Sequence, residues 1–324
     1  MEERKEVINR FVSQGLTTAK ASSIAGMSRS TYYYKPKGGV KGKKPSTFSY
    51  KVDGSIVGND VIINRIKEII SDDFIDYGYD KVTACLRWEN LIINPKKVYR
   101  LMANNRLLNP KIGRQKSAKN YVQFRQPYPG FPLQNLEIDI KYIYIAGLKV
   151  NAYLITILDV LSRKALVWDM ALSMKSDRVI DLFNSLIDKY LQPRNLFASD
   201  LTITLRSDNG SQFIANKVRQ FLLDNHIGHE FILPATPQQN AYIESFHSSV
   251  EKLVCQKFDF ESLKHAKEVF LNFFDTYNYR RILKCIGYLT PDQFFNLVEE
   301  EGAVVAYNIK SKKQLIFFRK KQVA

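Results

Sequence analysis

The pattern of side chains from residue 132 onward constrains the fold most, because polar and apolar residues alternate there with the period of a β-strand. The run LEIDIKYIYI (136–145) is followed, after short connections, by two more strand-like runs, VNAYLITILDV and RKALVWDMAL. Beyond them helix-like and strand-like segments alternate: SDRVIDLFNSLIDKYL, LTITLRSD, NKVRQFLLDNHI, HEFILPA and a long helix from about Gln239 to Gln256. Three strands followed by this alternation predict an α/β domain over 132–299, with a mixed five-stranded sheet and flanking helices.

The first 131 residues differ from the rest in charge. They carry 24 Lys and Arg against 11 Asp and Glu, within a chain whose net charge is +16. Such a basic front end indicates a partner with many negative charges, most often nucleic acid. A basic surface that serves only solubility is the alternative.

Two helical blocks lie in this basic part, and both predict small all-α modules. Residues 1–35 read as short helices, and AGMSRSTYYY has the small residue, the glycine and the Ser cap of a helix-turn-helix. Residues 59–110 read as a second helix-turn-helix-like domain, in which Asn94 caps a helix that begins with Pro95. Plain helix packing without DNA contact is the alternative for the first block.

The remaining segments are rich in lysine, glycine and proline. We interpret 36–58 and 111–131 as basic linkers, which are flexible or lie along phosphates, and 300–324 as a basic tail.

Three acidic residues stand where this fold would bring them together. Asp139 lies in mid-strand on the polar face, where an inward charge is unfavourable unless it is paired or binds metal. Asp208 ends the strand LTITLRSD, within RSDNGSQF, and Glu244 lies one or two turns into the helix that follows the last strand. Thirty-five residues separate Asp208 from Glu244. Adjacent strands would place Asp139 near Asp208; an ordinary Asp-Asn-Gly turn is the alternative for Asp208.

This ordered set resembles the D-D-E transposases and retroviral integrases. LEIDIKYI, TILDVLSRKALVW, RSDNGSQF and PQQNAYIESFHSSVEKL stand in the family's order, and YNYRRILKCIGYLTPDQF resembles the segment that closes these cores. MSRSTYYY and YGYDKVTACLRWE resemble the helix-turn-helix units of OrfB-type transposases of bacterial insertion sequences. The resemblance implies a ribonuclease H-like core whose catalytic and metal-binding residues are Asp139, Asp208 and Glu244.

The resemblance also implies chemistry and partners. Carboxylates suit Mg²⁺ or Mn²⁺, with two ions per active site. Water first frees a 3′-hydroxyl at the element end, and that hydroxyl then attacks another phosphodiester. The expected partners are double-stranded DNA, as terminal inverted repeats and as target, and further copies of the chain. Whether an upstream-frame helix-turn-helix protein is also required stays open. The alternatives are a catalytically silent DNA-binding protein and a ribonuclease H-like nuclease without strand transfer.

Polar and basic residues at expected DNA-facing positions complete the candidate site. In the basic part they are Arg29, Ser30, Tyr32, Lys43, Lys44, Lys96, Lys97 and Arg100. Around the carboxylates they are Asn209, Gln212, Asn240, His247 and Lys252. His247 and Lys252 are included because Ser248 stands where retroviral integrases have a DNA-contacting lysine. Two rival carboxylates, Glu137 and Asp159, are expected either to support the metal-binding residues from behind or to be structural.

Other classes of protein are excluded by what the sequence lacks. Its three cysteines form no CxxC pair, so neither a disulfide framework nor a zinc finger is indicated. The start MEERKEVINR has no apolar signal core, and no apolar run approaches the roughly 18–20 residues of a membrane span. We therefore expect an intracellular protein without a membrane partner, and the resemblance implies a cytoplasmic bacterial protein that associates with the nucleoid.

Overall fold

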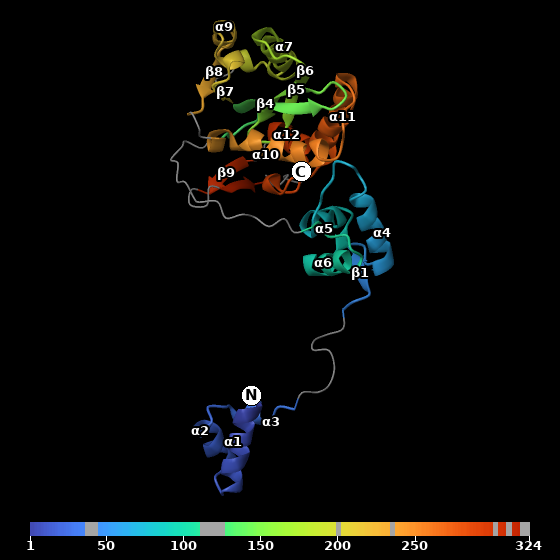
Figure 1. Cartoon of the computed structure of the whole chain (residues 1–324), viewed down its shortest axis with the longest axis vertical. Coiled ribbons are helices and arrows are strands. Elements are labelled where there is room, and N and C mark those ends of the chain that lie inside the picture. Colours follow the sequence, from blue (N-terminus) through green and yellow to red (C-terminus); the bar gives the residue numbers. More distant parts are fainter. Residues whose placement is uncertain are drawn as a thin grey trace, which may run out of the picture. The chain divides into compact units, whose positions relative to one another are not determined.

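The computed structural model describes residues 1–35, 45–110, 127–198, 202–233, 237–300, 304–308 and 313–317. The chain divides into two compact units, Met1–Thr47 and Phe48–Ala324 (Figure 1). Two of the expected DNA contacts, Lys43 and Lys44, lie outside the described residues. Within the described part of the chain, no helix has the length and apolar character needed to cross a membrane.

Three short helices make up the first unit: α1 (Glu2–Ser13), α2 (Thr18–Ile24) and α3 (Arg29–Tyr33). They share a core of three buried residues, Ile8, Ala21 and Met27. Gly26, at φ +60°, turns the chain between α2 and α3, because glycine adopts left-handed backbone without strain. Ser28 then accepts a hydrogen bond from the Thr31 N–H at 3.1 Å and caps α3. The helices and the turn expected for this segment are therefore present.

The second helical module contains strands as well as helices. Its helices are α4 (Asn59–Ile69), α5 (Tyr79–Trp88) and α6 (Pro95–Asn104). Its strands are β1 (Phe48–Lys51), β2 (Ile56–Gly58) and β3 (Leu91–Ile92), which pair antiparallel in the order β2-β1-β3. The linker expected over 36–58 is therefore wrong for residues 48–58, and this module is not purely α-helical. Asp53 accepts the Ser55 N–H at 2.9 Å and Gly54 turns at φ +85°, so local turn chemistry closes a hairpin.

The predicted mixed five-stranded sheet is confirmed. Its strands are β4 (Asn135–Ile145), β5 (Val150–Asp159), β6 (Ala165–Ala171), β7 (Ile203–Ser207) and β8 (Ile227–Phe231). Their order is β6-β5-β4-β7-β8. The first three form an antiparallel meander, and β7 and β8 run parallel to β4. β4 therefore lies at the centre of the sheet, with an antiparallel neighbour on one side and a parallel neighbour on the other.

Helices cover both faces of this sheet (Figure 1). On one face α7 (Ser176–Leu186) and α9 (Asn216–Asp224) pack over Leu136 and Ile138 of β4. On the other, α10 (Ala241–Val250) and α11 (Leu263–Asp275) pack over Ile143 of β4 in a core rich in phenylalanine. Burial of apolar side chains on both faces stabilises the layers, at roughly 25 cal/mol per Å² removed from water.

Three of these helices end in a wider, π-helical turn. The turns are η1 (Ile187–Leu191) after α7, η4 (Glu251–Cys255) after α10 and η5 (Thr276–Arg280) after α11. The shorter described elements are η2 (Leu196–Ala198), α8 (Ser211–Ile214), η3 (Pro237–Asn240) and η6 (Lys284–Ile286). Because π turns are rare and often lie at functional sites, the turns that end α10 and α11 indicate that these segments have a functional role.

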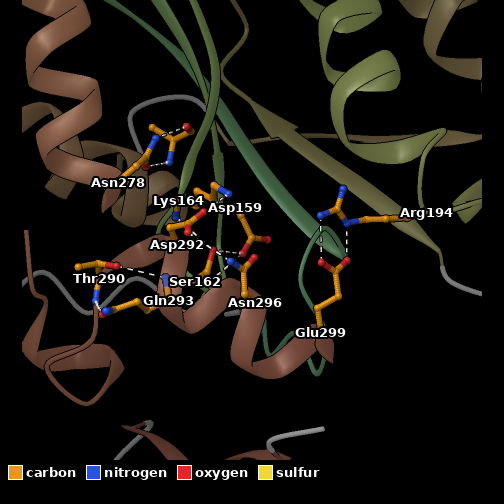
Figure 2. Close-up of polar contacts among 11 residues, drawn as sticks. Asp159, Ser162, Lys164, Arg194, Asn278, Thr290, Asp292, Gln293, Asn296 and Glu299 are labelled. Atoms are coloured by element: carbon orange, nitrogen blue, oxygen red, sulfur yellow. Dashed lines mark hydrogen bonds and ion pairs between the residues drawn. The ribbon is translucent and has the colours of Figure 1, made fainter. Parts of the chain in front are cut away.

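The last helix, α12 (Pro291–Glu300), is held to the β5–β6 end of the sheet by polar contacts (Figure 2). Lys164 Nζ lies 2.6 Å from Asp292 Oδ1 of α12. Ahead of α12, Asn278 exchanges two hydrogen bonds with the backbone of Ala165 and holds the preceding turn to the same part of the sheet. The segment that resembles a family closing motif therefore does close this core. In the expected basic tail, β9 (Val304–Asn308) and β10 (Lys313–Phe317) pair as an antiparallel hairpin.

Candidate active site

Asp139 lies in the middle of β4, and its side chain is partly buried. Its Oδ1 accepts the N–H of Ile140 at 2.8 Å, and its Oδ2 lies 3.4 Å from Nδ1 of His247 on α10. The central strand thus carries a carboxylate that the helix on that face approaches with an imidazole.

Asp208 follows the last residue of β7, next to β4. The parallel register pairs Glu137 with Arg206, so continuing it by two residues places Asp139 opposite Asp208. Neighbouring strands lie about 4.8 Å apart. Asp208 Oδ1 accepts the Gly210 N–H at 2.9 Å, so the Asp-Asn-Gly turn forms as well. A Cβ on Gly210 would lie 3.0 Å from that oxygen and 2.4 Å from Gln212 Nε2, so only glycine fits there without displacing a side chain.

Glu244 lies in the first turn of α10. Two hydrogen bonds hold the start of this helix next to β4. The Ile243 N–H donates to Glu137 Oε2 at 2.7 Å, and Asn240 Nδ2 donates to the Ile138 carbonyl at 3.4 Å. Glu244 therefore stands beside the strand that carries Asp139.

The charge of Asp139 acts on both other carboxylates. Burial raises the pKa of Asp208, and the Asp139 charge raises it further, against a hydrogen bond from Gly210 that lowers it. Burial and the Asp139 charge also raise the pKa of Glu244, and His247 lowers it. The three carboxylates therefore share one electrostatic environment, in which Asp139 belongs to both repulsive pairs.

The donor set fits a hard divalent cation by its chemistry. Carboxylate oxygens are the ligands that Mg²⁺ and Mn²⁺ prefer, and a cation would relieve the repulsion that raises two of the pKa values. Across the described residues, no three His, Cys, Asp or Glu side chains are grouped closely enough to hold a metal ion. The trio has the right donors on neighbouring elements, and its side chains would have to move together to coordinate an ion.

The rival carboxylates Glu137 and Asp159 are both fully buried. Asp159 accepts the N–H of Leu133 and both the N–H and the hydroxyl of Ser162. Burial raises the pKa of Glu137 to about 7, although the Ile243 hydrogen bond lowers it. Both side chains hold backbone segments in place.

The sequence is similar to known protein families and to individual proteins. Two integrase core domain families match residues 131–237 and 225–291, and an HTH-like domain family matches 59–116. The chain is 24% identical over 293 residues to a protein of insertion element IS476 from Xanthomonas euvesicatoria, covering 90% of this chain and 76% of that one. It is 23% identical over 252 residues to the transposase for insertion sequence element IS904 from Lactococcus lactis subsp. lactis, covering 74% and 94%. Residues 131–291 thus match integrase core domains, and over most of its length the chain is similar to proteins of bacterial insertion sequences.

Near the three carboxylates, several of the residues expected to contact DNA are hydrogen-bonded or ion-paired within the protein. Asn240 is 3% exposed and bonded to β4, so the expectation that it contacts DNA is wrong. Asn209 Nδ2 donates to the Ile232 carbonyl at 2.9 Å, and Lys252 pairs with Asp76. Gln212 lies beside Gly210. The side chain of His247 is 11% exposed and faces Asp139, while its Nε2 is buried without a hydrogen-bond partner in the described part of the chain.

In the second helical module, one of the three basic residues expected to contact DNA is buried. Lys97 is 9% exposed, and its Nζ donates to the Phe48 carbonyl at 2.5 Å and the Ser49 hydroxyl at 2.9 Å. Lys97 therefore anchors β1, and its assignment to DNA is wrong. Lys96 is exposed and Arg100 partly buried.

The first helical unit keeps two of its three expected contacts at the surface. Arg29 and Ser30 are exposed on α3. Tyr32 instead packs against the small core and donates its hydroxyl to Asn9 Oδ1 at 2.6 Å. The next two tyrosines, Tyr33 and Tyr34, are the exposed ones.

Sequence reasoning missed Arg206. Its Nη1 donates to the Gln239 carbonyl and its Nη2 to Glu230 Oε2, both at 2.9 Å. The guanidinium thus holds the segment that leads into α10 and Glu244. A signal was present, because a charged residue stands near the end of an apolar strand, two positions before Asp208 and on the same side of it.

Proposed function

We propose that this chain is a D-D-E polynucleotidyl transferase. It cuts DNA at the ends of its insertion sequence and joins the freed 3′-hydroxyl to target DNA. The observation that carries the proposal is the placement of Asp139, Asp208 and Glu244 on adjacent elements, with the Asp139 charge acting on both partners. The integrase core and HTH-like matches support the same function.

The three carboxylates would hold Mg²⁺ or Mn²⁺, two ions per site. When bound, such ions supply activation of the attacking oxygen and stabilisation of the leaving oxygen. The protein's own contribution is positional. Gly210 lets the chain turn so that its N–H holds Asp208 Oδ1, and Arg206 fixes the segment before Glu244. His247 stands beside Asp139 and orients its carboxylate.

The reaction proceeds in two displacements of the same kind. Water attacks the phosphodiester at the element end, and the bond to the 3′ oxygen breaks, which leaves a 3′-hydroxyl and a 5′-phosphate. That 3′-hydroxyl then attacks a target phosphodiester and displaces a second 3′ oxygen, so the number of phosphodiester bonds is conserved. The partners are the terminal repeats, target DNA and further copies of the chain, acting in the cytoplasm on the nucleoid.

The test uses labelled duplexes taken from the genomic DNA that flanks this reading frame, with Mg²⁺ or Mn²⁺. Asp208→Asn is compared with wild type and with Asp188→Asn, an exposed aspartate on η1. We expect cleaved and joined products from wild type and Asp188→Asn, and a loss of at least about a hundredfold in Asp208→Asn. Calorimetric titration with Mn²⁺ should show weakened binding in the same variant alone.

Three results would argue against the proposal. Equal activity of wild type and Asp208→Asn would remove Asp208 from the site. Binding of the duplexes without any metal-dependent product would favour a silent DNA-binding protein. Cleaved products that are never joined would favour a nuclease.

A further inference from the structure

A strap of nine residues, 72–80, runs from just after α4 into the first turn of α5 and lies against the catalytic core. Phe74 inserts into the phenylalanine-rich core between α10 and α11, with its ring centroid 5.7 Å from those of Phe258 and Phe273. It is 8% exposed. A residue that belongs by sequence to the helix-turn-helix-like module is thus part of the core beneath the active-site sheet.

Asp76 is the centre of the polar contacts of the strap. Its Oδ1 lies 2.6 Å from Nη2 of Arg281, and its Oδ2 lies 2.5 Å from Nζ of Lys252. The Arg281 side chain is 7% exposed, and its Nη1 donates to the Phe74 carbonyl at 3.1 Å. Burial acts to raise the pKa of Asp76, but the charges of Arg281 and Lys252 hold it below its usual value. Asp76 is therefore an ionised carboxylate clamped by two cations that follow α10 and α11.

Further contacts fix the strap on both sides of Asp76. Before it, Asp72 pairs with Arg280 at 2.8 Å. After it, the Tyr77 hydroxyl accepts the Ile282 N–H at 2.7 Å, and Asp80 pairs with Lys284 at 2.5 Å. The strap is thus held along its length by the segment that follows α11.

The same docking fixes α6. Helices α4, α5 and α6 share one apolar core, and this core includes Ile282 from the catalytic part of the chain. The exposed start of α6 carries Lys96 and Tyr99. α6 cannot pivot relative to β4 without breaking the contacts of Asp76, Phe74 and Ile282.

We infer that Asp76 is a positioning residue that holds the DNA-facing start of α6 at a constant distance from Asp139. The chain then accepts DNA only when the base pairs contacted by α6 and the phosphodiester to be cut have one fixed spacing. This inference rests on the proposed function, because the spacing matters only if Asp139 serves a DNA-cutting site.

The spacing test uses the flanking-DNA duplex and versions with about five or ten base pairs, half or one helical turn, inserted between the α6 footprint and the cut. The footprint is mapped first by hydroxyl-radical protection. Wild type should lose more than about tenfold in cleavage with either insertion, since a rigid holder tolerates neither rotation nor distance. Asp76→Asn should cut the inserted duplexes within about threefold of the original, because a released module can follow the DNA.

Two control variants separate positioning from folding. Glu68→Gln removes an exposed ion pair with Arg65 inside the module and should keep the wild-type spacing preference. Asp76→Glu keeps the negative charge and should retain most of the wild-type spacing preference. A variant that merely unfolds loses cleavage of every duplex and gains none, so acceptance of inserted duplexes is a change that destabilisation alone does not produce.

A distance measurement tests the docking without catalysis. Spin labels are placed at Ala103→Cys on α6 and Leu223→Cys on α9, both exposed positions, in full-length protein without Cys85, Cys255 and Cys285. We expect one narrow distance distribution, which broadens with Asp76→Asn and not with Glu68→Gln. A broad distribution in the parent protein would overturn the inference. A narrow distribution in the parent protein would also overturn it if that protein cut duplexes of every spacing equally well. If no duplex is cut by any protein, the proposed function fails, and the distance distribution alone decides whether Asp76 fixes α6.

Discussion

The backbone N–H of Ile243 donates to Oε2 of Glu137 across 2.7 Å, and this bond ties the first turn of α10 to β4. The first N–H groups of a helix have no partner within the helix, and a carboxylate there satisfies one of them. Glu137 is fully buried, two residues before Asp139, and Ile243 directly precedes Glu244. Together with the bond from Asn240 to Ile138, this buried hydrogen bond fixes the separation of two proposed metal ligands.

Glu137→Gln should change how stability depends on pH. The pKa of Glu137 is raised from 4.5 to about 7 by burial, so the folded state holds its proton more tightly than the unfolded state. Stability from this group is therefore lost as pH rises from about 4.5 to 7, by up to about 3 kcal/mol. Gln keeps the acceptor for Ile243 and removes the titration. Urea unfolding at several pH values should show this change in the unfolding free energy, with Glu268→Gln as an exposed control. If the unfolding free energies of wild type and Glu137→Gln depended on pH in the same way, the prediction would be wrong.

His229→Gln should remove a dependence of stability on pH whose sign is opposite to that of Glu137. Burial, and then the Arg219 charge, lowers the pKa of His229 from 6.5 to about 4. The unfolded state binds the proton first, so wild-type stability falls as pH drops from about 6.5 to 4. Because this slope and that of Glu137 oppose each other over part of the range, each is visible only as a difference between wild type and variant. Thermal unfolding at pH 7.5 and 4.5 checks it. A variant as acid-sensitive as wild type would contradict the assignment.

Gly210→Ala should lower activity more than stability. Its backbone, at φ −58°, is open to alanine, but the new Cβ would press on Asp208 Oδ1 and on the Gln212 amide. We expect a loss of about tenfold in cleavage with less than about 1 kcal/mol in unfolding free energy. The double variant Gly210→Ala, Gln212→Ala removes the Gln212 clash alone. Full activity of the single variant would show that the orientation of Asp208 in this turn is unimportant.

Lys96→Ala and Lys97→Ala should separate DNA binding from folding on one helix. Lys97 is buried and bonded to β1, so its loss leaves two acceptors unpaired and should lower stability by about 1–3 kcal/mol. Lys96 is exposed, so its loss should weaken DNA binding and reduce the salt slope by about one, with stability unchanged. Urea unfolding and binding at several salt concentrations measure both. A loss of stability in Lys96→Ala, with weakened DNA binding only in Lys97→Ala, would refute this account of α6.

The sheet was predictable because alternation along β4 to β6 and the helix–strand order are local patterns. Which part of each sheet face the helices cover could not be predicted. Tyr142 and Tyr144 continue the apolar face of Leu136 and Ile138 yet are exposed, because α7 and α9 cover only the other end of that face. The burial of Lys97 likewise depends on acceptors nearly fifty residues away, at Phe48 and Ser49.

The placement of the three carboxylates on neighbouring elements was predictable from their spacing, and their role in catalysis stays a prediction. The contacts made by the polar residues around them were not predictable. Asn240 and Lys252 read as free polar residues near Glu244, and each is bound by a residue far along the chain, Ile138 and Asp76. Such pairings arise from tertiary packing, which single-sequence patterns do not contain.

The π-helical turns η4 and η5 make the clamp on Asp76 sensitive to chain length. Lys252 lies within η4, and Arg281 directly follows η5. A π turn contains an extra residue, and removing it to restore a regular α-helix would rotate the residues after the turn by about 100°. Deleting one residue from η5 would thus point Arg281 away from Asp76, and deleting Glu251 from η4 would do the same to Lys252, even if every other amino acid were unchanged. In related chains, a single-residue gap at these two turns would separate proteins that share the residue types from those that share the clamp.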